Sequence, residues 1–197
     1  MTEVLVLYYS RNGSTANLAR QIARGVEEVA GVSARVRTVP AVSAVTTASE
    51  SDVPSSGAPY VTSQDIEECV GYAFGSPTRF GNMAAPMKFF MDGLGAQWAS
   101  GVMIGKPAAV FTSTASMHGG QESTLLTMLV PLLHQGCVIT GIPFSEALLS
   151  STQTGGSPYG ATHVAGPNAD ATLSDDEAAL ARALGKRLAT LALKLRD

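Results

Sequence analysis

The sequence predicts an α/β protein with one parallel β-sheet and helices on both of its faces. Short apolar runs alternate with helical patterns five times along the chain, which is typical of a doubly wound sheet. The first run, residues 4–9, is continuously apolar, as expected for a strand covered on both faces. A length of 197 residues favours a single domain, residues 1–197, with a core that needs no disulfide or structural metal.

The first half of the chain is interrupted by a segment with no periodic pattern, residues 40–63. Ser, Thr, Ala and Pro dominate there, so we expect an insertion rather than a second domain. The elements expected around it are a strand at 4–9, a loop at 10–15, a helix through Leu18, Ile22, Val26 and Val29 that stops at Gly31, a strand at 34–39, a short helix from Asp65 and a buried strand at 71–75.

The second half contains another stretch expected to be a loop, residues 143–171, which is rich in Gly, Ser and Pro. Pro131 predicts a kink or an early end in the helix that contains it. The expected elements are a helix at 86–94, a strand at 107–112, a helix at 123–135, a strand at 137–142, and a last helix opened by the capping box Ser174–Glu177.

Five strands in this alternation match the flavodoxin-like order 2-1-3-4-5. In such a sheet, ligands bind outside the carboxyl ends of the strands, at the switch point beside the first strand. The loops expected to carry function are therefore 10–15, 76–83 and 112–122.

Composition narrows the class of protein. The 13 basic and 16 acidic residues leave a net charge of −3, too mild and mixed for a nucleic-acid partner. Charged residues are 15% of the chain where about 25% is usual, which suggests surface hidden in an oligomer, with many small Ser, Thr and Gly residues as the alternative explanation. The two cysteines predict a reduced, cytoplasmic protein. We expect no membrane insertion, because no apolar run reaches the length of a bilayer span, and no secretion, because the N-terminus lacks a basic region.

The loop after the first strand has the composition of an anion site. Its hydroxyls and free backbone N–H groups can surround a phosphate at a helix N-terminus. It lacks the lysine of a Walker loop, so a flavin mononucleotide phosphate suits it better than a triphosphate. An ordinary capped turn is the alternative. The candidate residues are Ser10, Arg11, Asn12, Gly13, Ser14 and Thr15.

The two other loops can hold a flat ring. Residues 76–83 combine a proline, a cation, an aromatic side chain and a glycine; a plain surface turn is the alternative. Residues 112–122 are rich in hydrogen-bond donors and contain two adjacent glycines. The candidates from these loops are Thr78, Arg79, Phe80, Ser113, Thr114, Ala115, Ser116, Met117 and His118.

Three further side chains have open roles. His118 is either a proton donor or simply exposed, and His134, at a helix end, is either functional or structural. Trp98 is expected in a loop, where packing in the core or at an interface is the plain alternative to substrate binding. The three histidines lack the spacing of metal ligands, so no metal site is expected.

Taken together, these segments resemble the WrbA-type NAD(P)H:quinone oxidoreductases. The resemblance covers nearly the whole chain and is most specific at residues 75–83. The segments that carry it are Val4–Ser10, Gly75–Met83, Trp98–Gly101, Gly119–Glu122 and Pro158–Ala161.

The resemblance implies a flavodoxin-like homotetramer that binds FMN and reduces quinones with NADH or NADPH. It implies that residues 10–15 hold the FMN phosphate, that Thr78, Arg79 and Phe80 border the isoalloxazine, and that residues 113–118 hold its other edge. It places His134 beside the ring and links Trp98 to the aromatic substrate. Hydride would pass from the nicotinamide to FMN and then to the quinone, with both substrates using the same face in turn. Arg79 and His134 are the candidate catalytic residues.

Two other functions remain open on the same fold. One is a flavodoxin-type one-electron carrier, although such carriers are usually strongly acidic and a net charge of −3 supports this weakly. The other is a non-catalytic regulatory binding protein, since a fold does not specify a function. A steady-state assay with NADH and benzoquinone separates the three.

Overall fold

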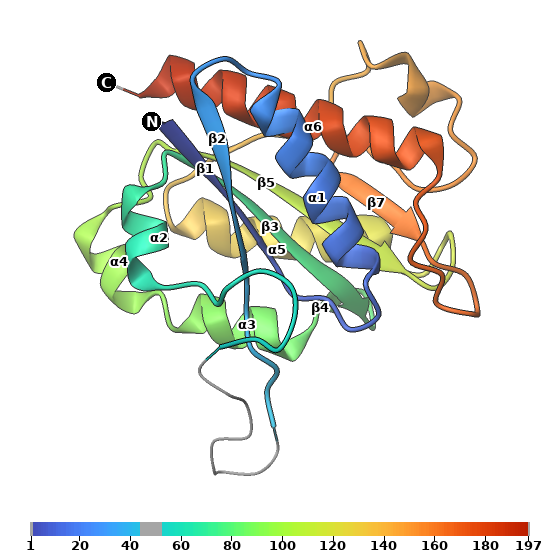
Figure 1. Ribbon diagram of the computed structural model, residues 1–197, viewed down its shortest axis with the longest axis horizontal. Coiled ribbons are helices and arrows are strands. Elements are labelled where there is room, and N and C mark those ends of the chain that lie inside the picture. The colour runs from blue at the N-terminus through green and yellow to red at the C-terminus, as the bar shows by residue number, and fades with distance from the viewer. Residues whose placement is uncertain (1, 44–52, 197) are drawn as a thin grey trace.

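The computed structural model describes residues 2–43 and 53–196 of the chain. Its main sheet has the order β2-β1-β3-β5-β6, and each of these neighbouring pairs is parallel (Figure 1). Counted along the chain, this is the predicted order 2-1-3-4-5, so the predicted fold class is confirmed. The strands are β1 (Thr2–Tyr8), β2 (Val32–Thr38), β3 (Gly71–Arg79), β5 (Pro107–Thr114) and β6 (Val138–Ile139).

Helices cover both faces of the sheet (Figure 1). Two of them, α1 (Ser14–Glu27) and α6 (Asp175–Leu195), lie side by side on one face. The other face carries α2 (Ser63–Glu68), α3 (Ala85–Asp92), α4 (Gly95–Ser100) and α5 (Gln121–His134).

The continuous apolar run of β1 contributes side chains to two separate hydrophobic cores. Val4 and Val6 pack with side chains of α1 and α6 in one core. Leu5 and Leu7 pack with side chains of α3 and α5 in the other. Successive side chains of a strand point to opposite faces, so a strand covered on both sides must be apolar throughout.

The backbones of α1 and α6 touch at a pair of glycines. A Cβ atom added at Gly25 would lie 1.9 Å from the carbonyl oxygen of Arg182, and one at Gly185 would lie 2.0 Å from that of Ile22. Neither position has room for a larger residue, so these glycines set how closely the two helices cross.

The fifth strand differs from the prediction because it is split. The predicted strand at 137–142 forms only at Val138–Ile139, which pairs with Pro107–Ala108. The chain then leaves the sheet and returns as β7 (Ala161–Val164), which pairs with the later part of β5. The expectation of a loop throughout 143–171 is therefore wrong, since this segment also holds a 3-10 helix, Ala147–Ser150. The short run Ala-Thr-His-Val lies among glycines and prolines, so the sequence pattern did not indicate a strand there.

Smaller differences surround the carboxyl end of β3. This strand continues past residue 75 to Arg79, and a two-residue strand, β4 (Asn82–Met83), folds back on it. Trp98 lies on helix α4 and not in a loop. Helix α5 continues past Pro131 to His134, so the predicted early end does not occur.

The insertion expected at 40–63 falls partly on residues 44–52, which lie outside the described residues. Its last part returns to the sheet, because Tyr60 forms a parallel bridge with Thr38 at the end of β2. The short helix expected from Asp65 begins two residues earlier, at Ser63. Among the described residues, no helix is both long and apolar enough to cross a bilayer.

Candidate functional site

The loop between β1 and α1 leaves the N-terminus of its helix open. Gly13 precedes the first turn of α1 with a φ of 90°, a left-handed conformation that glycine adopts without strain. No described side chain caps this helix, and its first turn contains no acidic residue. The loop is therefore not the ordinary capped turn that was the alternative. Its free N–H groups and the helix dipole favour an anion.

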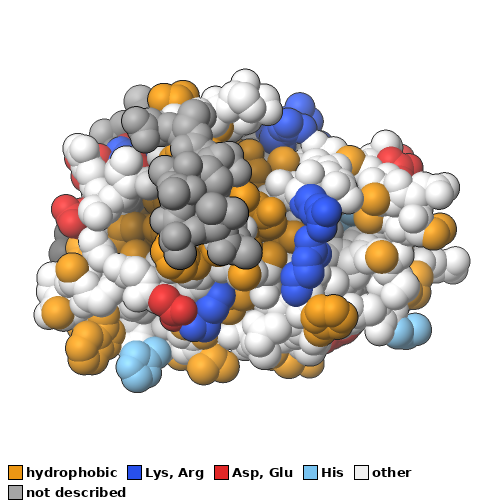
Figure 2. Space-filling model, turned by 90° about the horizontal axis from the view of Figure 1, so that it is seen from below, with side chains coloured by type: hydrophobic (Ala, Val, Ile, Leu, Met, Phe, Trp, Pro, Cys, Tyr) orange, Lys and Arg blue, Asp and Glu red, His pale blue; other side chains and the backbone are white. Residues whose placement is uncertain are grey.

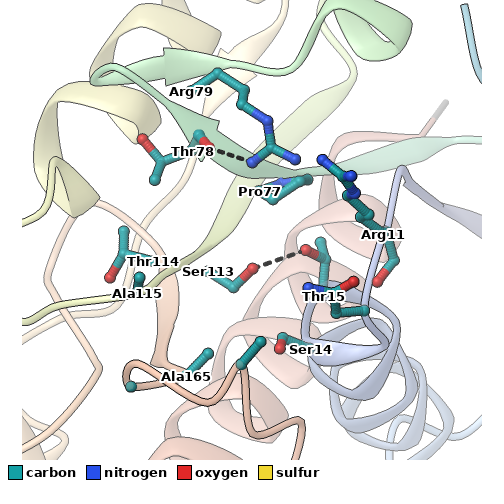
Figure 3. Close-up of a pocket in the computed structure, with 14 residues that line it drawn as sticks. Arg11, Ser14, Thr15, Pro77, Thr78, Arg79, Ser113, Thr114, Ala115 and Ala165 are labelled. Atoms are coloured by element: carbon teal, nitrogen blue, oxygen red, sulfur yellow. Dashed lines mark hydrogen bonds between the residues drawn. The ribbon is translucent and has the colours of Figure 1, made fainter.

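Hydroxyl groups surround this helix N-terminus. The Ser10 Oγ atom is buried and has no hydrogen-bond partner among the described residues. Thr15 Oγ1 and Ser113 Oγ lie 3.0 Å apart and join this loop to the end of β5 (Figure 3). Buried hydroxyls normally have a partner, so the unpartnered Ser10 hydroxyl indicates that a bound group completes this site.

A cavity of about 170 Å³ lies over these groups, at the carboxyl ends of β1, β3 and β5. This is the switch point at which the predicted fold class places its ligand. Figure 3 shows side chains from the separate loops turned toward one another across it. The predicted residues that line it are Ser10, Arg11, Asn12, Ser14, Thr15, Thr78, Arg79, Ser113, Thr114 and Ala115.

The loop after β3 is a tight, strained turn. Phe80 has a φ of 53° and Gly81 a φ of 79°, so the chain reverses between β3 and β4. The Thr78 hydroxyl anchors the turn, because its oxygen lies 2.8 Å from Thr124 Oγ1 and accepts from the Gly81 N–H at 3.3 Å. The Phe80 ring is fully exposed at the tip. A positive φ is uncommon for an aromatic residue, and residues with such strained backbone conformations cluster at ligand sites.

Two arginines stand at the mouth of the cavity. Arg11 comes from the first loop and Arg79 from the second, and their side chains approach the same region above Pro77 in Figure 3. Both also line a second hollow, which contains Tyr9 and Phe80. Neither forms an ion pair with any residue in 2–43 or 53–196, so no acidic side chain of that part of the chain neutralises them.

The third loop contributes only its first residues to the cavity. Ser113 and Thr114 are buried, and Thr114 Oγ1 donates to the Ser116 carbonyl at 2.7 Å while accepting from Gln121 Nε2 at 3.0 Å. The remaining candidates, Ser116, Met117 and His118, are exposed and do not line the cavity.

His134 and Trp98 lie together in a different groove. Their rings stack with centroids 6.1 Å apart and planes at 24°. The groove, of about 580 Å³, is lined mainly by α3, α4 and α5. Within one chain it is separate from the first cavity. It reaches the second hollow through Asn82, Met83 and Lys88, which line both. Both rings are exposed, so packing of Trp98 in the core of its own chain is excluded.

The turn at 165–170 is a part of the site that the sequence reasoning missed. Ala165, Gly166 and Ala169 line the cavity from the side opposite β3. Ala165 follows β7, and its N–H donates to the Thr114 carbonyl at 2.8 Å. Recognising the strand at 161–164 would have placed the next residues at the carboxyl edge of the sheet with the other loops.

Behind this turn lies a buried charged pair. His163 Nδ1 and Glu177 Oε2 are 2.8 Å apart, and both side chains are almost completely buried. Burial raises the pKa of Glu177, but hydrogen bonds from His163, Thr154 and backbone N–H groups outweigh it and bring that pKa to about 2. Burial lowers the pKa of His163, but its hydrogen bonds to Glu177 and to the Asp170 carbonyl leave it raised. The described residues contain no cluster of three metal-ligating side chains.

Known sequences and solved structures match nearly the whole of this chain. A protein called NAD(P)H dehydrogenase (quinone) from Gluconacetobacter diazotrophicus is 43% identical over 198 residues and matches 99% of both chains. One of the same name from Syntrophobacter fumaroxidans is 42% identical over 200 residues, 98% of each chain.

Among solved structures, a WrbA-like flavodoxin from Agrobacterium tumefaciens matches with a TM-score of 0.69 at 19% identity and covers 100% of both chains. At that identity the likeness establishes the fold. The family described as NADPH-dependent FMN reductase matches residues 2–146. The family resemblance expected from the sequence is thus confirmed, and this chain belongs to the NADPH-dependent FMN reductase family.

Proposed function

We propose that this protein is an FMN-dependent NAD(P)H:quinone oxidoreductase that uses NADH or NADPH as co-substrate. The observation that carries the cofactor assignment is the open N-terminus of α1 beside the unpartnered Ser10 hydroxyl. The reaction follows from the full-length relatives called NAD(P)H dehydrogenase (quinone), which are 40–43% identical to this chain.

The residues present fit the phosphate of FMN. A dianionic phosphate accepts hydrogen bonds from backbone N–H groups and hydroxyls, and these are what the first turn of α1, Ser10 and Thr15 offer. The flavin ring would then extend toward Thr78 and Arg79 and into the hollow bordered by Tyr9 and Phe80. When bound, FMN supplies the two-electron chemistry between a nicotinamide and a quinone.

The chain itself supplies charge and flat surfaces around that ring. Arg11 and Arg79 place two cations where negative charge would develop during reduction, which stabilises it. Phe80 is a candidate surface for a planar substrate. The stacked Trp98 and His134 form another, with His134 as a candidate proton donor, in the groove that adjoins the hollow.

We further infer a homotetramer in the cytoplasm. Exposed apolar side chains are numerous among the described residues, and Figure 2 shows many of them on the face seen from below. Several lie along α3, α4 and α5, including Phe89, Trp98, Val130 and Leu133. Contiguous exposed apolar surface favours association. Both cysteines are free and buried, which supports a reducing compartment. Light scattering at micromolar concentration tests the tetramer, and a fully active monomer would contradict it.

One pair of measurements tests the function. FMN titrated into the apoprotein should bind with one site per chain, and the holoprotein should oxidise NADH or NADPH with benzoquinone in a ping-pong pattern. Tight FMN binding without turnover would instead support the one-electron carrier or a regulatory protein. Failure to bind FMN would reject the site itself.

A further inference from the structure

His163 is almost completely buried, with 2% of its surface exposed, and hydrogen-bond acceptors face both of its ring nitrogens. Nδ1 lies 2.8 Å from the Glu177 carboxylate, and Nε2 lies 2.8 Å from the Asp170 carbonyl oxygen. A carbonyl oxygen cannot donate a proton, so Nε2 must carry one. The charge state of His163 therefore depends on whether Glu177 can donate.

Glu177 acts only as an acceptor. Its Oε1 atom accepts from the Thr154 hydroxyl at 2.6 Å, the Gly155 N–H at 2.9 Å and the Val164 N–H at 3.0 Å. Its Oε2 atom accepts from the Ser174 N–H at 2.9 Å. A carboxylate held by this many donors is ionised. Nδ1 of His163 therefore carries a proton as well, and the ring is a buried imidazolium.

The imidazolium holds the turn that closes the phosphate cavity. The Asp170 carbonyl that accepts from His163 also accepts from the hydroxyl of Ser14, the first residue of α1, at 3.4 Å. The next carbonyl, that of Ala171, accepts from Asn17 Nδ2 at 2.5 Å. The end of the turn is thus tied to the first turns of α1, and the other end is tied to β5 through Ala165.

We propose that His163, as an imidazolium, is a positioning residue that fixes the turn at 165–170 against the phosphate loop and thereby sets the affinity for the phosphate of FMN. The proposal rests on the proposed function, since FMN is taken as the ligand. It goes beyond that function because His163 does not line the cavity and acts through the Asp170 backbone.

The proposal predicts a dependence on pH in the alkaline range. The charged groups that act on His163 are Glu177 of α6 and the exposed carboxylate of Asp170, and both favour the imidazolium by raising its pKa. A raised pKa means that the proton is lost as pH rises through the folded value, above the ordinary 6.5. The FMN phosphate is already fully ionised there, because its second pKa is about 6. A loss of affinity in this range therefore reports on the protein.

Two measurements on the wild-type protein test this without any substitution. Nitrogen-15 NMR of the apoprotein at about pH 7 should show both ring nitrogens of His163 protonated, and a neutral tautomer would overturn the proposal. Calorimetry between about pH 7 and pH 10 should show FMN affinity falling with the same midpoint as the NMR titration. Affinity that stays constant while the imidazolium signal disappears would overturn it too.

A variant and its control locate the effect. The H163Q variant should bind FMN about tenfold more weakly at neutral pH, since a hydrogen bond from a charged donor is lost, and its affinity should not change further with pH. Riboflavin has no phosphate, so its affinity should be equal in both proteins. D176N removes a neighbouring charge of α6 and should bind FMN as the wild type does. Equal FMN affinity in H163Q and wild type would overturn the proposal, whereas a wild type that binds no FMN would reject the proposed function instead.

Discussion

The N-termini of α1 and α6 contrast within the same face of the sheet. Helix α6 opens with a complete capping box between Ser174 and Glu177 and has three acidic residues in its first turn. Helix α1 opens with Gly13 and has no acid in its first turn, and among the described residues it has no side-chain cap and the buried Ser10 hydroxyl beside it has no partner. In both helices the dipole is positive at this end, and the first-turn N–H groups have no partner within the helix itself.

The difference teaches how one structural element serves stability or binding. At α6 the chain satisfies its own donors, so substitutions there should change the free energy of unfolding. At α1 the backbone donors and the Ser10 hydroxyl are left for a ligand, so replacing Ser10 should change affinity for FMN and leave stability almost unchanged. The proposed link from Glu177 through His163 to the FMN site is the one exception at α6. The following predictions test this separation, beginning with the largest expected effect.

Replacing Glu177, in the first turn of α6, with alanine should lower the free energy of unfolding more than any other substitution considered. The substitution leaves the His163 imidazolium buried without its counter-charge, and breaking a buried pair in this way costs about 3–5 kcal/mol. Urea unfolding should show this loss of stability. The matched control is D176N, at the neighbouring position, which should change stability by less than about 0.5 kcal/mol. A small effect of E177A would contradict the assignment of a buried ion pair.

Lowering the pH should reduce the stability that Glu177 contributes to the wild-type protein. The pKa of Glu177 is about 2 in the folded protein, below the ordinary value of 4.5, so its contribution is present above that ordinary value. The contribution is lost as pH falls toward the folded pKa. The difference in unfolding free energy between wild type and E177Q should therefore shrink from about pH 4.5 downward. A difference that stays constant with pH would contradict the prediction.

Replacing Ser10 with alanine should affect binding and not folding. The hydroxyl has no partner in residues 2–43 or 53–196, so its removal breaks no hydrogen bond within that part of the chain. In the complex it would donate to a charged phosphate, a contact worth about 1.5–3 kcal/mol, or roughly ten- to a hundredfold in affinity. Calorimetry with FMN and with riboflavin measures this, and riboflavin should bind S10A and wild type equally. A loss of stability in S10A would contradict the proposal that the N-terminus of α1 serves binding and that of α6 serves stability.

Replacing Ser174 with alanine should have the smallest effect. It removes the acceptor of the Glu177 N–H, a 3.2 Å hydrogen bond, and the loss of such a cap costs about 1 kcal/mol. Thermal unfolding should show a modest fall in the midpoint, with unchanged FMN affinity at neutral pH. A loss of affinity as large as that of S10A would show that the two helix ends are not separate.

Much of the fold was predictable because its signals are local. The apolar run at 4–9, the loop after it and the capping box at Ser174 each lie within a few consecutive residues, and the structure confirms all three. Strand order followed from the alternation of elements. The split fifth strand was not predictable in this way, because four residues between glycine-rich stretches give too short a pattern.

The candidate site shows the same limit. Three loops were found because each follows a recognisable strand, and the structure brings them to one cavity. His163 was taken only as a histidine without metal-ligand spacing, and Glu177 only as part of a cap. Their contact depends on β7 packing beside the start of α6, which no pattern in either segment indicates. His134 and Trp98 lie in the adjoining groove, so their predicted contact with the ring remains a prediction.

The paired glycines where α1 crosses α6 bear on how this protein can change over evolutionary time. Gly25 and Gly185 each face a backbone carbonyl of the opposite helix, so a side chain at either one forces the helices apart. Neither residue lines the cavity, yet the first turn of α1 is held in place by that crossing. Selection for cofactor binding should therefore act on two positions that never meet the cofactor. Drift that accommodates a larger residue at one of them would require the other helix to move as well.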